Sequence, residues 1–387
     1  MSRPAVTPVA DLSPDQVRSL RLASLLLRPH PAGPEATSVA EVVTWLGALQ
    51  AQDHGSGLWS LGVRLPHLDQ AGVEAALERR EALRTWPMRG TVHLVPARDA
   101  RWMVQILGER PLAQAEHRRK QIGLDAATAD RAVEVIGEAL AGGGRLTRAQ
   151  VLERLTASGL SVSGQLGYHL LWYASQHAVS CIAPHVDGEQ TFVLLDEWAP
   201  DPWLPEREEA LATIAARFVR GHGPVPLKDF VGWTGLTAAD ARLAVAGAGE
   251  EIVTVTCDGV PMLVSAQLLD SPTAADTAAD DATAGSPVAL LPGFDEFVLG
   301  YKDRSLLMTP EQFQVVVPGG NGIFQPTVVR DGRVAGTWKR KKLTARSRLE
   351  VALFDDAVRD GVLDAGLAAA ADGYARYLGQ PVELRVG

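Results

Sequence analysis

Two glutamines separated by one residue, Gln50 and Gln52, are the first side chains whose type and spacing could do chemistry. A glutamine cannot act as a general base near neutral pH, but its carbonyl oxygen can orient water and place a negative dipole beside a developing cation. In an extended segment positions 50 and 52 share a face, whereas on a helix they diverge by about 200°. Glutamines after a helix are also ordinary solvent-facing residues, so the spacing alone leaves both interpretations open.

A dense run of cations is the second candidate. The whole chain has a net charge of −9, so long-range attraction cannot bring it to DNA or to an anionic membrane. A local patch could still bind DNA, because each phosphate that it neutralises releases condensed counterions. The alternative is a merely solvated surface. The residues of this basic run are Lys339, Arg340, Lys341 and Lys342.

Other chemistries find little support in the sequence. We see no serine or cysteine nucleophile motif, no P-loop and no glycine-rich dinucleotide loop. Cys181 and Cys257 lie far apart without metal-ligand spacing, which is typical of buried thiols in a reducing cytosol. The chain lacks a signal-peptide pattern and an apolar window of roughly 20 residues. We therefore expect a cytoplasmic protein.

The elements that must position these residues follow a repeated plan. Thr147 and Gln150 form a capping-box pattern, a second helix is expected from Ser163, and two strands are expected around Asp187-Gly188. The same order recurs later: helices over 205–220 and 228–233, a helix capped by Thr237, and strands over 252–256 and 260–264. This helix-turn-helix plus hairpin pattern predicts winged-helix units.

The N-terminal third resembles a looser copy of that unit. Ser13 and Gln16 predict a helix cap, and a second helix is expected to carry Val39 and Leu49 on one face. A third helix over 71–80 leads into strands within 85–95.

The C-terminal part is expected to be mixed. It should contain strands over 288–291, 314–317, 324–329, 334–338 and 382–386, with one helix over 346–359.

The fold class that follows is α+β, with tandem winged-helix units and a β-rich C-terminal unit. A chain of 387 residues suggests two or three structural units, at roughly 100–200 residues per domain. The segment 270–287 is acidic and rich in Ala and Thr, so it cannot bury much apolar surface and is expected to be a flexible loop. The expected segments are 1–125, 126–204, 205–269, 270–287 and 288–387.

A winged-helix helix fits the DNA major groove while its wing meets phosphate, which favours DNA binding. Winged helices also serve as protein–protein scaffolds. The expected groove helices carry few cations: Gln165, His169 and Gln176 in one, and Arg242 in the other. The pattern leaves both functions open.

Four motifs, in the same order, resemble those of the AlkZ/YcaQ-like winged-helix DNA glycosylases, and the resemblance spans nearly the whole chain. The motifs are Leu49-Gln50-Ala51-Gln52, Thr85-Trp86-Pro87-Met88-Arg89-Gly90-Thr91-Val92-His93-Leu94, Leu290-Leu291-Pro292-Gly293-Phe294-Asp295-Glu296-Phe297 with Gly300-Tyr301-Lys302-Asp303-Arg304, and Pro318-Gly319-Gly320-Asn321-Gly322.

That resemblance implies an enzyme that excises N7-alkylated purines; some members unhook interstrand crosslinks. The family's catalytic signature, Gln, an aliphatic residue, then Gln or Asp, falls here on Gln50 and Gln52, which is similar to the AlkZ-like branch. Ala51 is small for the middle position. The resemblance implies no metal or organic cofactor, and it implies double-stranded damaged DNA as the partner of a monomer without membrane contact.

The resemblance also places Arg89, His93 and Arg304 among the DNA-binding residues, with Lys339, Arg340, Lys341 and Lys342. Internal ion pairs of Arg89 and Arg304 are the alternative, because Asp303 adjoins Arg304. Asp53 is interpreted as a helix-end group rather than as a support for Gln52. A non-catalytic winged-helix regulator and a scaffold for protein partners remain the alternatives for the whole chain.

Overall fold

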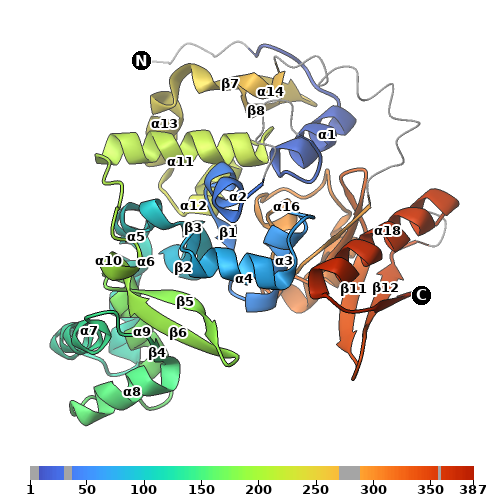
Figure 1. The fold of residues 1–387 in the computed structure, drawn as a ribbon. Coiled ribbons are helices and arrows are strands. Elements are labelled where there is room, and N and C mark those ends of the chain that lie inside the picture. Colours follow the sequence, from blue (N-terminus) through green and yellow to red (C-terminus); the bar gives the residue numbers. More distant parts are fainter. Residues whose placement is uncertain (1–7, 30–36, 270–287, 356–358) are drawn as a thin grey trace, which may run out of the picture. The chain divides into compact units, whose positions relative to one another are not determined.

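The computed structural model describes residues 8–29, 37–269, 288–355 and 359–387, and the chain divides into two compact units. Both units combine helices with strands, which confirms the predicted α+β class (Figure 1). The predicted loop over 270–287 lies outside the described residues, and the division into tandem winged-helix units stays a prediction. The first unit comprises Met1–Val73, Leu211–Trp233 and Ala238–Gly387, and the second comprises Glu74–Ala210 and Thr234–Thr237.

Serine caps begin the two N-terminal helices of the first unit. Helix α1 (Pro14–Ser24) starts at Ser13, as predicted, and α2 (Val39–Leu46) starts at Ser38. In both helices the serine hydroxyl accepts the backbone N–H three residues later, and the side chain of that residue accepts the serine N–H. These reciprocal bonds satisfy backbone donors that the first turn of a helix leaves open.

The second helix ends before the two glutamines. Gly47 has a φ of 81°, which is in the left-handed region that glycine adopts without steric cost. Leu49 was expected on the face of this helix, but it lies in the short strand β1 (Leu49–Gln50). The strand therefore includes Gln50 but not Gln52, which lies in a bend, so the extended stretch that a shared face would require is present only at Gln50.

Helix α3 (His54–Gly62) packs closely on α18 (Gly361–Leu378). A Cβ atom at Gly62 would come within 2.5 Å of the Tyr377 ring, so only glycine permits this approach. The indole of Trp59 lies with its ring centroid 4.8 Å from that of Tyr377. The C-terminal helix thus supports the helix that follows the glutamines.

The helices and the hairpin predicted between 205 and 264 are present in the structure. The turn of the hairpin is Asp258-Gly259, whose φ values of 49° and 74° are both positive, as the favoured two-residue hairpin turn requires. The elements are α11 (Arg207–His222), α12 (Leu227–Thr234), α13 (Ala238–Gly247), β7 (Ile252–Cys257), β8 (Val260–Ser265) and α14 (Ala266–Leu269).

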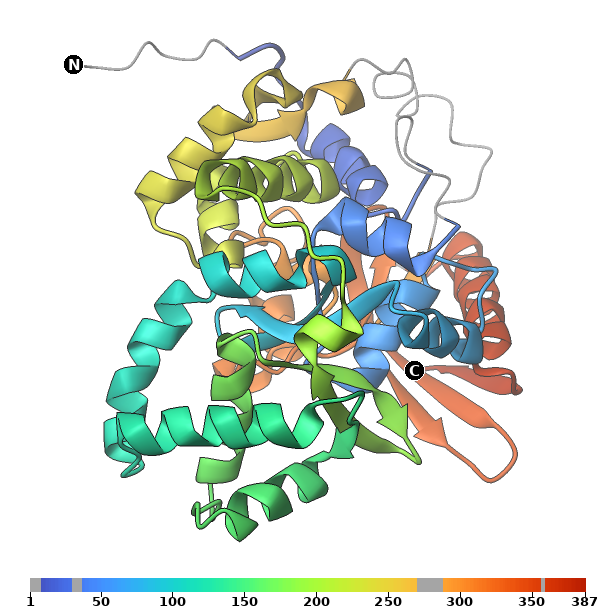
Figure 2. The same cartoon turned by 60° about the vertical axis from the view of Figure 1, so that its left-hand side comes forward.

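A five-stranded sheet forms the β-rich C-terminal part, as predicted, and α18 packs on it. The strand order is β13-β12-β11-β10-β9, with β12 and β13 parallel and the other pairs antiparallel. Figure 2 shows the hairpin of β11 and β12, in orange to red, extending to a loop at its tip. The strands are β9 (Val288–Leu291), β10 (Thr327–Arg330), β11 (Arg333–Lys342), β12 (Ser347–Leu353) and β13 (Val382–Val386).

Two predictions for this part were wrong. The strand expected over 314–317 falls mostly within α17 (Pro310–Val316), which Thr309 begins with a capping box and with proline in the first turn. Where a helix was expected over 346–359, residues 347–353 form strand β12, in which alternate residues are buried, and residues 356–358 lie outside the described residues. Period-2 burial fits a strand between two neighbours and not a helix.

The second unit packs helices against another sheet. Strands β3, β2, β5, β6 and β4 are adjacent in that order, and α7, α8 and α9 lie against the strands β4 to β6 (Figure 1). The strands are β2 (Ala82–Met88), β3 (Thr91–Pro96), β4 (Leu146–Thr147), β5 (Ser180–Val186) and β6 (Glu189–Leu194). The helices include α5 (Ala100–Leu107), α6 (Glu109–Gln121), α7 (Ala126–Leu140), α8 (Arg148–Ala157) and α9 (Leu166–Gln176). Helix α4 (Gln70–Glu78) contains the point at which the chain passes from the first unit to the second.

Helix α9 is a core helix. It was expected to begin at Ser163, but it begins at Leu166 and is buried along most of its length. His169 and Gln176, two of the polar groups expected on a groove-reading face, are both buried. This helix therefore contributes to the interior of the second unit, where it packs on α7 and β2.

A buried ion pair ties α3 to the segment that follows β9. The guanidinium of Arg64 donates to both carboxylate oxygens of Asp295, at 2.8 and 3.0 Å, and both side chains are at most 1% exposed. Ser60 of α3 donates a further hydrogen bond to Asp295 at 3.0 Å. A charge buried this deeply is tolerated only with such partners.

We expect Arg64→Leu to lower the free energy of unfolding by about 3–5 kcal/mol, because Asp295 would be left as an unpaired buried charge. Chemical denaturation measures this loss. The matched control is Arg385→Leu, whose ion pair with Glu383 is exposed and should contribute less than about 1 kcal/mol. Equal losses in the two variants would contradict the role given to the buried pair.

Candidate active site

The Gln50–Gln52 segment joins β1 to α3 in the first unit. Gln50 is only 7% exposed and Ala51 is fully buried, whereas Gln52 is exposed. The small middle residue is thus part of the interior. Asp53 caps α3 by accepting the N–H of Ser56 at 2.7 Å, which confirms its interpretation as a helix-end group.

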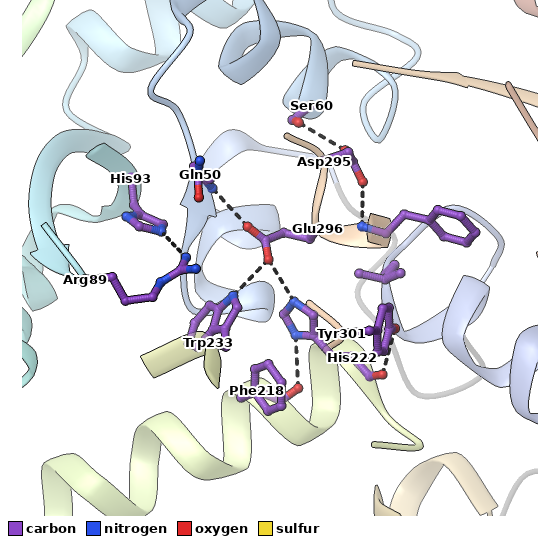
Figure 3. Close-up of polar contacts among 12 residues, drawn as sticks. Gln50, Ser60, Arg89, His93, Phe218, His222, Trp233, Asp295, Glu296 and Tyr301 are labelled. Atoms are coloured by element: carbon purple, nitrogen blue, oxygen red, sulfur yellow. Dashed lines mark hydrogen bonds and ion pairs between the residues drawn. The ribbon is translucent and has the colours of Figure 1, made fainter. Parts of the chain in front are cut away.

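The carboxylate of Glu296 holds the backbone at Gln50 (Figure 3). Glu296 lies in the short helix α16 (Glu296–Leu299) and is 1% exposed. Its Oε1 accepts the N–H of Gln50 at 3.0 Å, and its Oε2 accepts the indole N–H of Trp233 at 2.9 Å. His222 lies 3.2 Å from the same Oε2. Glu296 therefore joins β1, α11 and α12 at one buried point.

The His222–Glu296 contact contains one proton. The Nδ1 atom of His222 lies 3.1 Å from the carbonyl oxygen of Phe218, and a carbonyl can only accept, so Nδ1 carries a hydrogen. The contact of Nε2 with Glu296 Oε2 then needs one further proton, on either the ring or the carboxyl group. In both arrangements the pair is neutral as a whole, which suits a site that is fully buried and packed by the rings of Phe218 and Trp233.

Two consecutive carboxylates hold both sides of the glutamine segment. Asp295 binds Arg64 and Ser60 of the α3 region, while Glu296 binds Gln50 of β1. The preceding residue, Phe294, has a φ of 64°, which is unusual for a residue with a side chain. Strain of this kind persists where the surroundings fix the backbone, and here it accompanies the turn that precedes both acids.

Arg89 and His93 lie on the β2–β3 hairpin of the second unit. His93 is buried, with Nδ1 2.9 Å from the carbonyl of Thr91, so its Nε2 accepts a hydrogen bond from Arg89 at 3.1 Å (Figure 3). Arg89 itself is half-buried, with a φ of 56° in the hairpin turn. The buried His93 side chain therefore contacts the guanidinium group of the half-buried Arg89.

Arg304 is packed on aromatic rings in the first unit. Its guanidinium carbon lies 5.0 Å from the ring centroid of Phe313, and its Nε donates to the carbonyl of Val298 at 2.9 Å. Burial lowers the pKa of Arg304, and Asp229 acts in the opposite direction. The neighbouring Asp303 pairs instead with Lys228 at 3.4 Å, and Arg304 forms no ion pair among the described residues.

The basic run occupies the outer half of β11. Lys339, Lys341 and Lys342 are exposed, and Arg340 is half-buried with its Nε 2.9 Å from the hydroxyl of Ser347. Lys341 pairs with Glu350 at 2.7 Å. Within the described residues, Lys339 and Lys342 have no carboxylate partner, so their charges face solvent.

The predicted site residues thus divide between the units. Gln50, Gln52, Arg304 and the basic run belong to the first unit, and Arg89 and His93 belong to the second. Sequence reasoning missed Glu296, His222 and Trp233 as supports of Gln50. The one available signal was a pair of adjacent acids between phenylalanines, at 294–297, because charged residues inside an apolar segment must find buried partners.

Metal sites and membrane-spanning helices are two further features that would bear on function. Within the described ranges, no cluster of three or more His, Cys, Asp or Glu residues could hold a metal ion. None of the helices in these ranges combines the length and the apolar character needed to cross a membrane.

Comparisons with known proteins agree with the motifs. The family model described as "DNA glycosylase AlkZ-like" matches residues 43–377. An "Interstrand DNA cross-link repair glycosylase" from Streptomyces sahachiroi is 25% identical over 337 residues, which are 84% of this chain and 87% of that protein. The solved structure of Streptomyces sahachiroi DNA glycosylase AlkZ has a TM-score of 0.78 and 24% identity, covering 97% of this chain and all of that one. Because the family model covers most of its length, the chain belongs to the AlkZ-like DNA glycosylase family.

Proposed function

We propose that this chain excises N7-alkylated purines from double-stranded DNA, interstrand crosslinks included, with Gln50 and Gln52 as its catalytic residues. Membership of the family makes it a DNA glycosylase, an enzyme that hydrolyses N-glycosidic bonds. The observation that carries the proposal is the anchoring of Gln50: its backbone N–H is bound by a fully buried carboxylate, 3.0 Å away. A group that acts by electrostatics must be held in place before the reaction.

The chemistry of the substrate explains why amides suffice. Alkylation at N7 gives the purine a positive charge, so the C1′–N9 bond can break with its electron pair going to N9, and the base leaves neutral. The sugar becomes an oxocarbenium-like cation. Water adds to C1′ and loses a proton to solvent, which gives an abasic site. No strong general acid is needed to protonate the leaving base.

The chain's own contribution is then position and dipole. Gln50, buried and tied to Glu296, places a carbonyl dipole near the developing cation, while the exposed Gln52 orients the attacking water. The neutral His222–Glu296 pair fixes the backbone without adding a net charge beside the sugar. This division of roles follows from the different exposure of the two glutamines.

DNA contact is assigned to exposed and half-buried cations. Lys339 and Lys342 face solvent on β11, with Arg340 and Lys341 between them, and we propose that they contact phosphate. We propose that Arg89, in the second unit, and Arg304, in the first unit, also contact phosphate. His93 is too deeply buried to touch DNA, so we propose that it acts by orienting Arg89.

Crosslinks are included because a related protein is named for their repair. A base that is tethered to the opposite strand cannot be swung into a tight pocket, unlike the bases that many glycosylases extrude. Catalysis by positioned dipoles requires access only to the sugar and to water. The same two glutamines can therefore serve monoadducts and crosslinks.

We expect Gln50→Ala and Gln52→Ala each to slow excision of N7-methylguanine by about 100-fold, the effect of losing one preorganised dipole. Binding of the same duplex should change little, because the Gln50 backbone contact with Glu296 remains. Release of base is measured by alkaline cleavage of the abasic site. The control is Gln267→Ala, an exposed glutamine on α14. Parental rates in both active-site variants would show that the catalytic residues lie elsewhere.

The charge of the lesion provides a second test. We expect a duplex with N7-methylguanine to be cut, and the same duplex with uracil at that position to stay intact, because uracil leaves as an anion and needs more help than amide dipoles supply. The measurement is again strand cleavage after alkali. Comparable rates on the two duplexes would refute a mechanism that depends on the cationic base.

The role of the basic run is tested by salt dependence. For Lys339→Gln with Lys342→Gln we expect weaker duplex binding, and the slope of log affinity against log salt should decrease by about 2, since each lost phosphate contact removes about 0.9. Arg131→Gln with Arg359→Gln is the control, because both arginines are exposed but ion-paired. An unchanged slope in the lysine variant would mean that the run is a solvated surface.

A further inference from the structure

A cavity of about 720 Å³ lies in the second unit, among α6, α8, α9 and the β2–β3 turn. This volume is in the range of small-molecule sites. Its described lining contains three arginines and no acidic residue. The residues that matter for its chemistry are Arg89, Arg118, Arg148, Tyr168, His169 and Trp172.

Two of the arginines, Arg118 and Arg148, give the cavity a positive charge that no carboxylate of its lining balances. Arg118 donates to the side-chain oxygens of Gln121, at 3.1 Å, and Gln165, and both partners are neutral amides. Arg148 is the exposed first residue of α8. Among the described residues neither arginine forms an ion pair with a carboxylate, so the guanidinium groups can bind an anion. Guanidinium geometry suits phosphate in particular.

Aromatic rings form a second part of the lining. Tyr168 is 43% exposed, an unusual position for a large ring, and it meets Trp86 edge to face at a centroid distance of 6.5 Å. Trp172 is buried beside His169, with ring centroids 5.3 Å apart. An exposed ring next to arginines is the arrangement on which nucleobases stack.

His169 supplies an unused hydrogen-bonding atom. The residue is 8% exposed, and its Nε2 has no hydrogen-bond partner among the described residues. Burial, reinforced by Arg119 and Arg118, lowers the pKa of His169 and so favours the neutral ring, in which Nε2 can accept or donate according to its tautomer. A buried polar atom left without a partner at a cavity points to a ligand that completes its bonding.

We propose that this cavity binds a nucleotide, with the base stacked on Tyr168, one base-edge hydrogen bond to His169, and the phosphate held by Arg118 and Arg148. A free nucleoside monophosphate and a nucleotide unstacked from a DNA strand share this chemistry. The assignment of the DNA strand as the source rests on the proposed function, whereas the site itself rests only on the lining of the second unit.

The test uses the full-length protein with dGMP, deoxyguanosine, inorganic phosphate and a single-stranded thymidine tetranucleotide, each titrated by calorimetry. We expect dGMP or the tetranucleotide to bind at least tenfold more tightly than deoxyguanosine or phosphate alone. Tighter binding of the tetranucleotide than of dGMP identifies the strand as the source, and the reverse order identifies the free nucleotide. If neither dGMP nor the tetranucleotide binds more tightly than deoxyguanosine and phosphate do, the proposal is overturned.

Variants at exposed positions, which leave the fold intact, assign the contacts. Tyr168→Ala should weaken binding of the preferred probe by roughly tenfold or more, through lost stacking. Arg148→Ala should weaken binding of the phosphorylated probes but not of deoxyguanosine. Arg154→Ala, an exposed arginine of the same helix that does not line the cavity, is the control and should behave like the parent. Parental affinity in both Tyr168→Ala and Arg148→Ala would overturn the site.

Excision of N7-methylguanine is measured in the same preparations to separate the two proposals. Protein that excises the lesion but binds neither nucleotide probe overturns the cavity's role alone. Protein that binds a probe in a Tyr168-dependent manner but releases no base supports the site and contradicts the proposed function.

Discussion

Two adjacent buried carboxylates, Asp295 and Glu296, are the constraint on which the geometry of the candidate active site depends. Neither carboxyl group could stay in the interior without hydrogen-bonding partners. Asp295 finds a bidentate arginine and a serine on one side, and Glu296 finds a backbone N–H, an indole and a histidine on the other. Because these partners come from β1, the α3 region, α11 and α12, satisfying two buried carboxyl groups fixes four parts of the first unit around the glutamines.

The sequence revealed local features of the fold better than pairings between distant segments. Capping boxes at Ser13 and Thr147 and the turns at Asp187 and Asp258 were predictable, because each depends on residues within a few positions. The stretch 346–359 was misjudged, since its apolar residues fit either period and only pairing with β11 and β13 selects the strand. Leu49 was misplaced because the left-handed turn at Gly47 was not recognised.

In the candidate active site, too, residues close in sequence could be found in advance and distant partners could not. Gln50 and Gln52 could be singled out because they are neighbours in the sequence, although the strand includes Gln50 and not Gln52. The supports could not be found in this way: Gln50 and Glu296 are 246 positions apart, and Glu296 is 74 from His222. Such partners become visible only when the fold brings them together. The roles of all of these residues in catalysis remain proposals.

The outer half of β11 has one more consequence. Its pairing with β10 stops at Thr337, so within the described residues Lys339–Lys342 have a strand neighbour on only one side. A free strand edge invites pairing with another chain, and lysines are a common guard against such aggregation because their charges repel an approaching copy. The same cations that we assign to phosphate would thus also protect the protein from self-association through its sheet. Selection against aggregation and selection for DNA binding would then favour the same residues at this edge.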